Sequence, residues 1–167
     1  MRTCSRTPAE VESRSAAGGV YTDNGAGAGG DFRRADTVQS AIADVRRYLG
    51  AHVMASIPCT AGSSWPKLNL HKGGKQHRLR AEGLRSDMAL FIANLRILAR
   101  VVRDGGGTIS FEWPRHCSLW REPVVKAFVV EFQLKAVDFD GCSVGLVHYV
   151  SGLPLLKPWR IYTDNHT

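Results

Sequence analysis

Several kinds of segment are missing from this sequence of 167 residues. No apolar run approaches the roughly 18 residues that a membrane-spanning helix needs, which excludes a helical membrane protein. The four cysteines, at positions 4, 59, 117 and 142, form no Cys-x-x-Cys pair, so neither a zinc ribbon nor a thioredoxin-type redox motif is indicated. The N-terminus has arginines but no apolar core segment, which argues against a secretory signal peptide. We therefore expect an intracellular protein with reduced thiols, no metal and no membrane partner.

Acidic residues are scarce in one stretch of the chain. Between Lys67 and Arg103, nine basic residues meet only two acidic ones, Glu82 and Asp87, so this stretch carries the whole formal net charge of +7. Such localised positive charge indicates an anionic partner, nucleic acid first, while a solvated surface is the alternative. The basic residues that we assign to nucleic-acid binding are Lys67, Lys72, Lys75, Arg78, Arg80 and Arg85.

The chain divides into a tail and one domain. Six of the thirteen residues from Gly18 to Gly30 are glycine, so we expect residues 1–30 to be a disordered Gly/Ala-rich tail. Residues 31–164 are expected to form an α/β domain with helices on the faces of the sheet and antiparallel C-terminal strands. The expected helices are 37–49, 123–132 and one from after Arg85 to the glycines at 105–107, which follows a Gly/Ser/Lys-rich loop. The expected strands are 52–57, 108–113, 135–139, 143–150 and 159–163.

Two side chains of chemical interest follow the ends of neighbouring predicted strands. Pro58 and Cys59 come directly after the strand 52–57, and Glu112 lies near the end of the strand 108–113. Ligands of open α/β sheets collect at the carboxyl ends of the strands, so a cysteine nucleophile and a carboxylate that hydrogen-bonds amide or amino groups could flank one substrate. The alternative is a small buried cysteine and a glutamate that caps a helix or is solvated.

These residues resemble the motifs of cytosine-5 DNA methyltransferases. In that family a Pro-Cys-Gln loop carries the nucleophile and a Glu-Asn-Val strand end carries the glutamate that binds the base. The segments that correspond here are Pro58-Cys59-Thr60, Glu112-Trp113-Pro114, the strand 157–162 and Gly30-Asp31-Phe32, which resembles the family's Gly-Asp-Ile cofactor segment.

A closer resemblance is to a divergent group of methyltransferase-like domains from protist genomes, often found beside retroelement genes. That group shares four segments, and the resemblance covers roughly residues 30–163. The matching segments are Ser56 to Trp65, Glu112 to Trp120, Phe139 to Leu146 and Lys157 to Ile161.

The resemblance implies a partial Rossmann-like methyltransferase sheet, with S-adenosylmethionine as the cofactor. It implies that the Cys59 thiolate adds to carbon 6 of an extruded cytosine and that Glu112 binds the ring nitrogen and the exocyclic amine. Arg160 would hold the base or position the cysteine, while Asp31 and Phe32 would contact the cofactor. If the chain is active, Cys59 should be accessible and within about one base width of Glu112.

Several family features are replaced in this sequence. Thr60 stands in place of the glutamine, and no Phe-x-Gly-x-Gly cofactor turn lies ahead of Cys59. We therefore expect a truncated or degenerate domain that transfers a methyl group to cytosine in DNA. The alternative is a catalytically inactive, mobile-element-derived module that binds nucleic acid at most. Either activity indicates a nuclear rather than a cytoplasmic location.

The remaining unusual residues are interpreted as structural. Tryptophans at positions 65, 113, 120 and 159 lie beside the motif-like segments, and we interpret them as packing residues rather than base-stacking platforms. Cys117, Cys142 and His116 fit no metal-ligand spacing, so structural cysteines are favoured over a metal site.

Overall fold

The computed structural model describes residues 31–62 and 74–165, which build one four-stranded sheet with its helices. The sheet has the strand order β1-β2-β4-β3. β1 runs parallel to β2, and β4 runs antiparallel to both β2 and β3. The predicted α/β class and antiparallel C-terminal strands are confirmed. The elements, with η for a 3₁₀-helix, are α1 (Ala35–Arg47), β1 (His52–Ser56), η2 (Thr60–Gly62), α3 (Gly74–Asp104), β2 (Thr108–Pro114), η3 (Ser118–Arg121), α4 (Pro123–Glu131), β3 (Lys135–Asp140), η4 (Gly141–Val144) and β4 (Pro158–Thr163).

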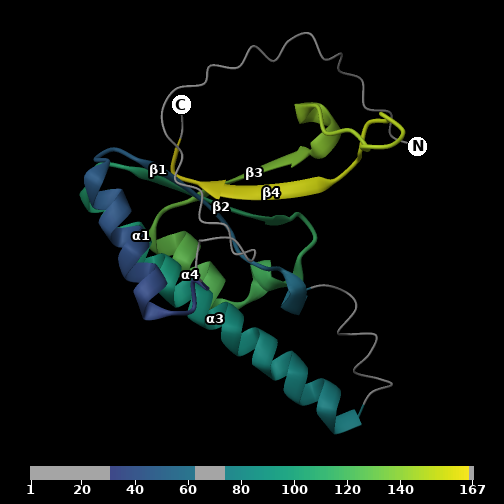
Figure 1. Cartoon of the computed structure of the whole chain (residues 1–167). Coiled ribbons are helices and arrows are strands. Elements are labelled where there is room, and N and C mark those ends of the chain that lie inside the picture. The colour runs from purple at the N-terminus through teal and green to yellow at the C-terminus, as the bar shows by residue number, and fades with distance from the viewer. Residues whose placement is uncertain (1–30, 63–73, 166–167) are drawn as a thin grey trace.

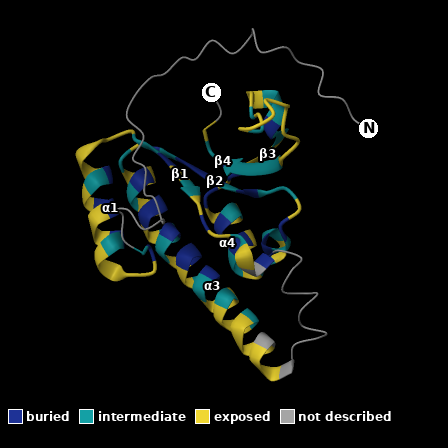
Figure 2. Cartoon of the chain, turned by 45° about the vertical axis from the view of Figure 1, so that its right-hand side comes forward, coloured by how far each residue is buried: buried dark blue, intermediate teal, exposed yellow. Residues whose placement is uncertain are grey.

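The three α-helices lie on one face of the sheet (Figure 1). The turned view shows the same arrangement, so the expectation of helices on both faces is wrong for the described residues (Figure 2). Pleating explains this one-sided burial, because successive side chains of a strand point to opposite faces. In β2, Ile109, Phe111 and Trp113 face the helices and are at most 1% exposed, while Glu112 between them points to the other face.

The core lies between the sheet and the helices. The helix α3 buries Ile92, Leu95 and Val102 along one stripe, and α4 buries Val125 and Phe128. This is the apolar spacing of 3.6 residues that the sequence shows, and burial of that stripe is the main stabilising contribution of these helices.

Aromatic rings form one cluster at the centre of the core. The Phe111 ring lies 4.5 Å from the Trp113 ring and 5.2 Å from the Trp120 ring, both in edge-to-face arrangements. Phe128 and Tyr162 extend the cluster to α4 and β4. The packing interpretation of Trp113 and Trp120 is therefore confirmed, and Trp159 packs on Phe139 at 5.5 Å. Trp65 and the predicted tail, residues 1–30, lie outside the described residues.

Two segments differ from the sequence-based expectation. The segment that ends at Arg85 was expected to be a loop, but α3 begins at Gly74. The start of α3 is rich in good helix formers, namely Lys, Gln, Arg, Leu and Glu, and their helix propensity outweighs the loop-like signal of the glycines.

The expected strand 143–150 is instead η4 and a turn with one isolated bridge, between Val147 and Pro154. Gly145, with φ of 84°, reverses the chain there, and the Leu146 amide bonds the Gly141 carbonyl at 2.9 Å.

Candidate functional site

Cys59 lies just past the carboxyl end of β1, in a loop that packs against the core. Its side chain is half-buried and contacts the core cluster. The Gly62 amide donates to the Cys59 carbonyl at 2.9 Å, and the Ser118 hydroxyl donates to the Gly62 carbonyl at 3.1 Å. A Cβ on Gly62 would lie 2.5 Å from the Cys117 Sγ. The close approach of η2 to η3 therefore fixes the position of the Cys59 loop.

Cys117, at the N-cap of η3, lies near Cys59. Burial raises the pKa of the Cys117 thiol, and the nearby Cys59 adds to the rise. Cys117 is only 9% exposed and belongs to the core, so its structural interpretation is supported.

Glu112 lies on β2, directly opposite Ser56 of the parallel strand β1. The Ser56 hydroxyl donates to Glu112 Oε2 at 2.8 Å. This register brings the ends of β1 and β2 together, as the sequence predicts, so the backbones at Cys59 and Glu112 lie at one edge of the sheet. Their side chains have different surroundings, because Glu112 is on the face without α-helices and Cys59 packs against the core.

Arg160 lies on β4, opposite Trp113 of β2 and Asp138 of β3. Its Nε and Nη2 donate to the two Asp138 oxygens at 2.7 and 2.8 Å. This bidentate pair lowers the pKa of Asp138 and raises that of Arg160. The residue opposite Glu112 on β4 is Ile161, so Arg160 is on the other face from the glutamate. Asp138 was not singled out in the sequence, and no motif marks it.

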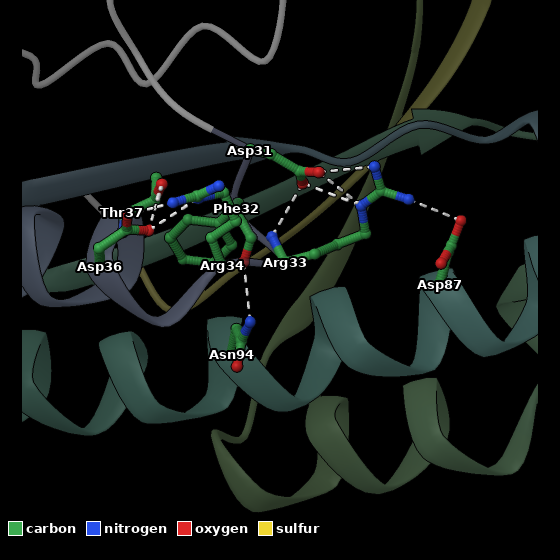
Figure 3. Close-up of polar contacts among 8 residues, drawn as sticks. All are labelled: Asp31, Phe32, Arg33, Arg34, Asp36, Thr37, Asp87 and Asn94. Atoms are coloured by element: carbon green, nitrogen blue, oxygen red, sulfur yellow. Dashed lines mark hydrogen bonds and ion pairs between the residues drawn. The ribbon is translucent and has the colours of Figure 1, made fainter.

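Asp31 and Phe32, the residues expected to contact a cofactor, connect the start of the described chain to α3 (Figure 3). Arg33 donates to both Asp31 oxygens at 2.5–2.9 Å and to Asp87 of α3 at 2.8 Å. These hydrogen bonds lower the pKa of Asp31. The Phe32 ring is 6% exposed, and its carbonyl accepts from Asn94 Nδ2 at 2.8 Å. Both residues are thus occupied by contacts within the protein, and as arranged they do not fit a cofactor-binding role.

The first half of α3, residues 74–87, carries exposed cations, and we call it the basic arm. It extends away from the sheet and the other helices in both views (Figures 1 and 2). Lys75, Arg78, Arg80 and Arg85 are all exposed. Among the described residues, none of these four has an ion-pair partner. Lys67 and Lys72, the other two predicted contacts, lie outside the described residues.

The other arginines of α3 are arranged differently. Arg96 and Arg100 both bond Glu131, at 2.8 and 2.6 Å, and Arg103 bonds Asp164 at 2.8 Å. Three of the nine basic residues between Lys67 and Arg103 are therefore ion-paired, with Arg96 and Arg100 sharing the one Glu131 carboxylate. The arginines with an ion-pair partner are Arg33, Arg34, Arg47, Arg96, Arg100, Arg103, Arg115 and Arg160.

Two general tests and three comparisons complete the description of the site. In residues 31–62 and 74–165, no three His, Cys, Asp or Glu side chains are grouped so as to hold a metal ion. Within the same ranges, no helix has the length and apolar character needed to cross a membrane. Comparison of the chain with protein-family models, with curated proteins and with solved structures gave no match.

Proposed function

We propose that this chain binds nucleic acid through the basic arm. The observation that carries the proposal is that Lys75, Arg78, Arg80 and Arg85 have no ion-pair partner among the described residues, whereas the other three arginines of α3 are ion-paired. Exposed like charges on one helix repel each other, which costs stability unless an anion neutralises them. Against these four cations the arm has Glu82 and Asp87, and Asp87 is already bonded to Arg33.

A polyanion is the partner that this arrangement fits best. Nucleic-acid phosphates are neutralised by Lys and Arg, with release of counterions, and this supplies most of the affinity of non-specific binding. The arm offers long cationic side chains on a rod that extends away from the sheet and the other helices, so a phosphate backbone can approach several of them at once.

The test is fluorescence anisotropy with labelled DNA, comparing two variants that lose the same charge. The arm variant replaces Lys75, Arg78, Arg80 and Arg85 with glutamine. The matched body variant replaces four other exposed cations, Arg46, Arg121, Lys126 and Lys135, with glutamine. Loss of binding in the arm variant alone supports the proposal, because net charge is equal in the two variants. Equal loss in both would contradict it.

A second candidate function, attack on cytosine by Cys59, is favoured by the parallel register of β1 and β2. The pairing of Ser56 with Glu112 brings the backbones at Cys59 and Glu112 to the same edge of the sheet, and this supports the candidate. The chemistry that this chain's own residues would perform is addition of the thiolate to carbon 6, with Glu112 hydrogen-bonded to the ring. The contacts of Asp31 and Phe32 do not fit a cofactor, so we derive no methyl-transfer step.

Attack by Cys59 is tested without any cofactor. When sulfur bonds to carbon 6, carbon 5 takes a proton from water. Loss of the original hydrogen from carbon 5 and expulsion of the thiolate then restore the base. DNA labelled with tritium at carbon 5 of cytosine should therefore release tritium to water. Release that is lost in Cys59→Ser and kept in Cys142→Ser supports the candidate, and no release from the wild-type protein would reject it.

A further inference from the structure

The basic arm is a helical rod of a definite size. None of its described side chains is buried, and Met88 is the first described residue of α3 that is. Fourteen residues at about 1.5 Å per residue make a rod about 20 Å long and about 10–12 Å across. The major groove of B-form DNA, about 12 Å wide and 8.5 Å deep, admits such a rod, whereas the major groove of A-form RNA is too narrow for side chains to read.

The cations of the arm lie on two opposite sides of the helix. At about 100° per residue, Lys75, Arg78 and Arg85 fall on one side. Arg80 falls almost diametrically opposite them. Glu82, the arm's carboxylate without an ion pair among the described residues, is on the first side, where three cations outnumber it. A helix in a groove has a phosphate strand along each flank, so cations on both flanks fit a duplex. A single strand or a flat anionic surface would call for cations on one side.

Between the two flanks, the arm presents a face of smaller and uncharged residues. It consists of Gln76, Leu79, Gly83 and Ser86, which point away from the stripe that α3 buries in the core. Leu79 is 57% exposed. Glutamine can bond adenine in the major groove, and an aliphatic side chain can contact the thymine methyl group.

Gly83 is the second observation, and it is independent of charge. Glycine inside an exposed helix is less favourable than alanine. A Cβ at Gly83 would meet nothing within 4 Å, so packing within the described protein does not require a glycine there. Close approach of a partner surface to the helix backbone would require it.

We infer that the basic arm docks lengthwise in the major groove of duplex DNA, with Gly83 at the point of closest approach. The inference rests on the proposed nucleic-acid binding. Lys75, Arg78 and Arg85 contact one phosphate strand, Arg80 contacts the other, and the face with Gln76 and Gly83 lies over the base edges.

The first test compares three ligands of one sequence: a DNA duplex of about 20 base pairs, the matching RNA duplex, and the DNA single strand. We expect the DNA duplex to bind at least about tenfold tighter than either of the others at the same salt concentration. Methyl green, which occupies the major groove, should displace the protein, and distamycin, which occupies the minor groove, should not. Equal affinity for all three ligands would overturn the groove inference and leave nucleic-acid binding intact. No binding to any of them would overturn both.

The second test adds bulk to the docking face only. A Cβ at Gly83 meets nothing within 4 Å, so Gly83→Leu should keep its helical circular dichroism and, because leucine is the better helix former, should unfold at or slightly above the wild-type temperature. We expect its affinity for the DNA duplex to fall by about tenfold, because the leucine side chain holds the helix away from the base edges. The matched control is Ala43→Leu, at an exposed position of α1, which should bind like the wild type. Unchanged affinity in Gly83→Leu would overturn the assigned docking face.

Discussion

Neutralising the basic arm should change how DNA binding depends on salt, by an amount that the structure sets. The change is the replacement of Lys75, Arg78, Arg80 and Arg85 with glutamine. Each phosphate contact contributes about 0.9 to the slope of log K against log salt concentration for B-form DNA, so four contacts contribute about 3.6. Between 50 and 200 mM salt, a fourfold change, the wild type should therefore lose about 150-fold more affinity than the arm variant.

The same replacement should leave the fold almost unchanged. All four side chains are exposed, and none has an ion-pair partner among the described residues. Surface substitutions of this kind change the free energy of unfolding by about 0.5 kcal/mol or less each. Urea unfolding followed by circular dichroism measures this free energy, and anisotropy at five salt concentrations gives the slope for each protein.

The result that would refute the reasoning is a slope that does not depend on the arm. The body variant, with Arg46, Arg121, Lys126 and Lys135 replaced, loses the same charge from other surfaces. Its slope should stay within about 1 of the wild-type slope, because these residues lie outside the proposed contact. Equal slopes in the wild type and the arm variant, or an equal reduction in both variants, would show that the arm does not contact phosphates.

Three further predictions concern stability and are checked by denaturation. Trp113→Phe removes the indole N–H that bonds the buried Ile57 carbonyl at 2.5 Å, and should cost about 1–3 kcal/mol in urea unfolding; an unchanged free energy would contradict this. Gly62→Ala should destabilise the protein, because its Cβ would lie 2.5 Å from the Cys117 Sγ and 2.6 Å from the Leu119 Cγ. Gly83→Ala, the matched control in open space, should stabilise it by about 0.5–1 kcal/mol. Hydrogen bonds from the Arg34 side chain and the Thr37 amide lower the pKa of Asp36 to about 2. A carboxyl group whose pKa is lower in the folded than in the unfolded state stabilises the fold at pH values above its unfolded-state pKa, and this stabilisation is lost as the pH falls through the folded-state pKa. The melting temperature of wild type should therefore exceed that of Asp36→Asn at pH 5, and the difference should vanish near pH 2; a difference that persists at pH 2 would show that the carboxylate charge is not its source.

Most of the helices and strands can be predicted, because the spacing of their apolar residues along the sequence matches the face that each element buries in the core. The alternation of Ile109, Phe111 and Trp113 predicts β2, and the spacing of Ile92, Leu95 and Val102 predicts the second half of α3. The basic arm was mistaken for a loop because it buries none of its described side chains. Without burial no apolar period marks a helix, and only intrinsic propensity remains as a signal.

The expected strand 143–150 fails for a different reason. Its apolar residues resemble a buried strand, but Val144, Val147 and Tyr149 are exposed, the last at 93%. At the start of this segment the chain forms η4 and then a turn at Gly145, in which the Leu146 amide donates to the Gly141 carbonyl. These local hydrogen bonds use backbone groups that would otherwise pair with a neighbouring strand. Apolar composition alone does not distinguish an exposed turn from a core strand.

The candidate site was predictable in its backbone and not in its side chains. Cys59 follows the end of β1 and Glu112 lies near the end of β2, and the order of elements that the sequence shows predicts that these two ends are neighbours. The face on which each side chain lies depends on the pleat and on which face the helices cover. The pairing of Arg160 with Asp138 depends on the position of β4 between β2 and β3, which no local pattern encodes.

The two candidate functions make different demands on the described arrangement. Nucleic-acid binding requires only the basic arm, whose cations are exposed and have no ion-pair partner in the described part of the chain, so it needs no rearrangement of the sheet. Attack on cytosine requires Cys59 to turn from the core toward a base that Glu112 also contacts. A role for Arg160 would require it to leave a bidentate pair with Asp138, and hydrogen bonds to charged groups are worth about 1.5–3 kcal/mol each. Binding of DNA by the arm is therefore the activity that the arrangement permits as it stands. Attack by Cys59 would depend on a substrate that supplies the free energy to open the loop.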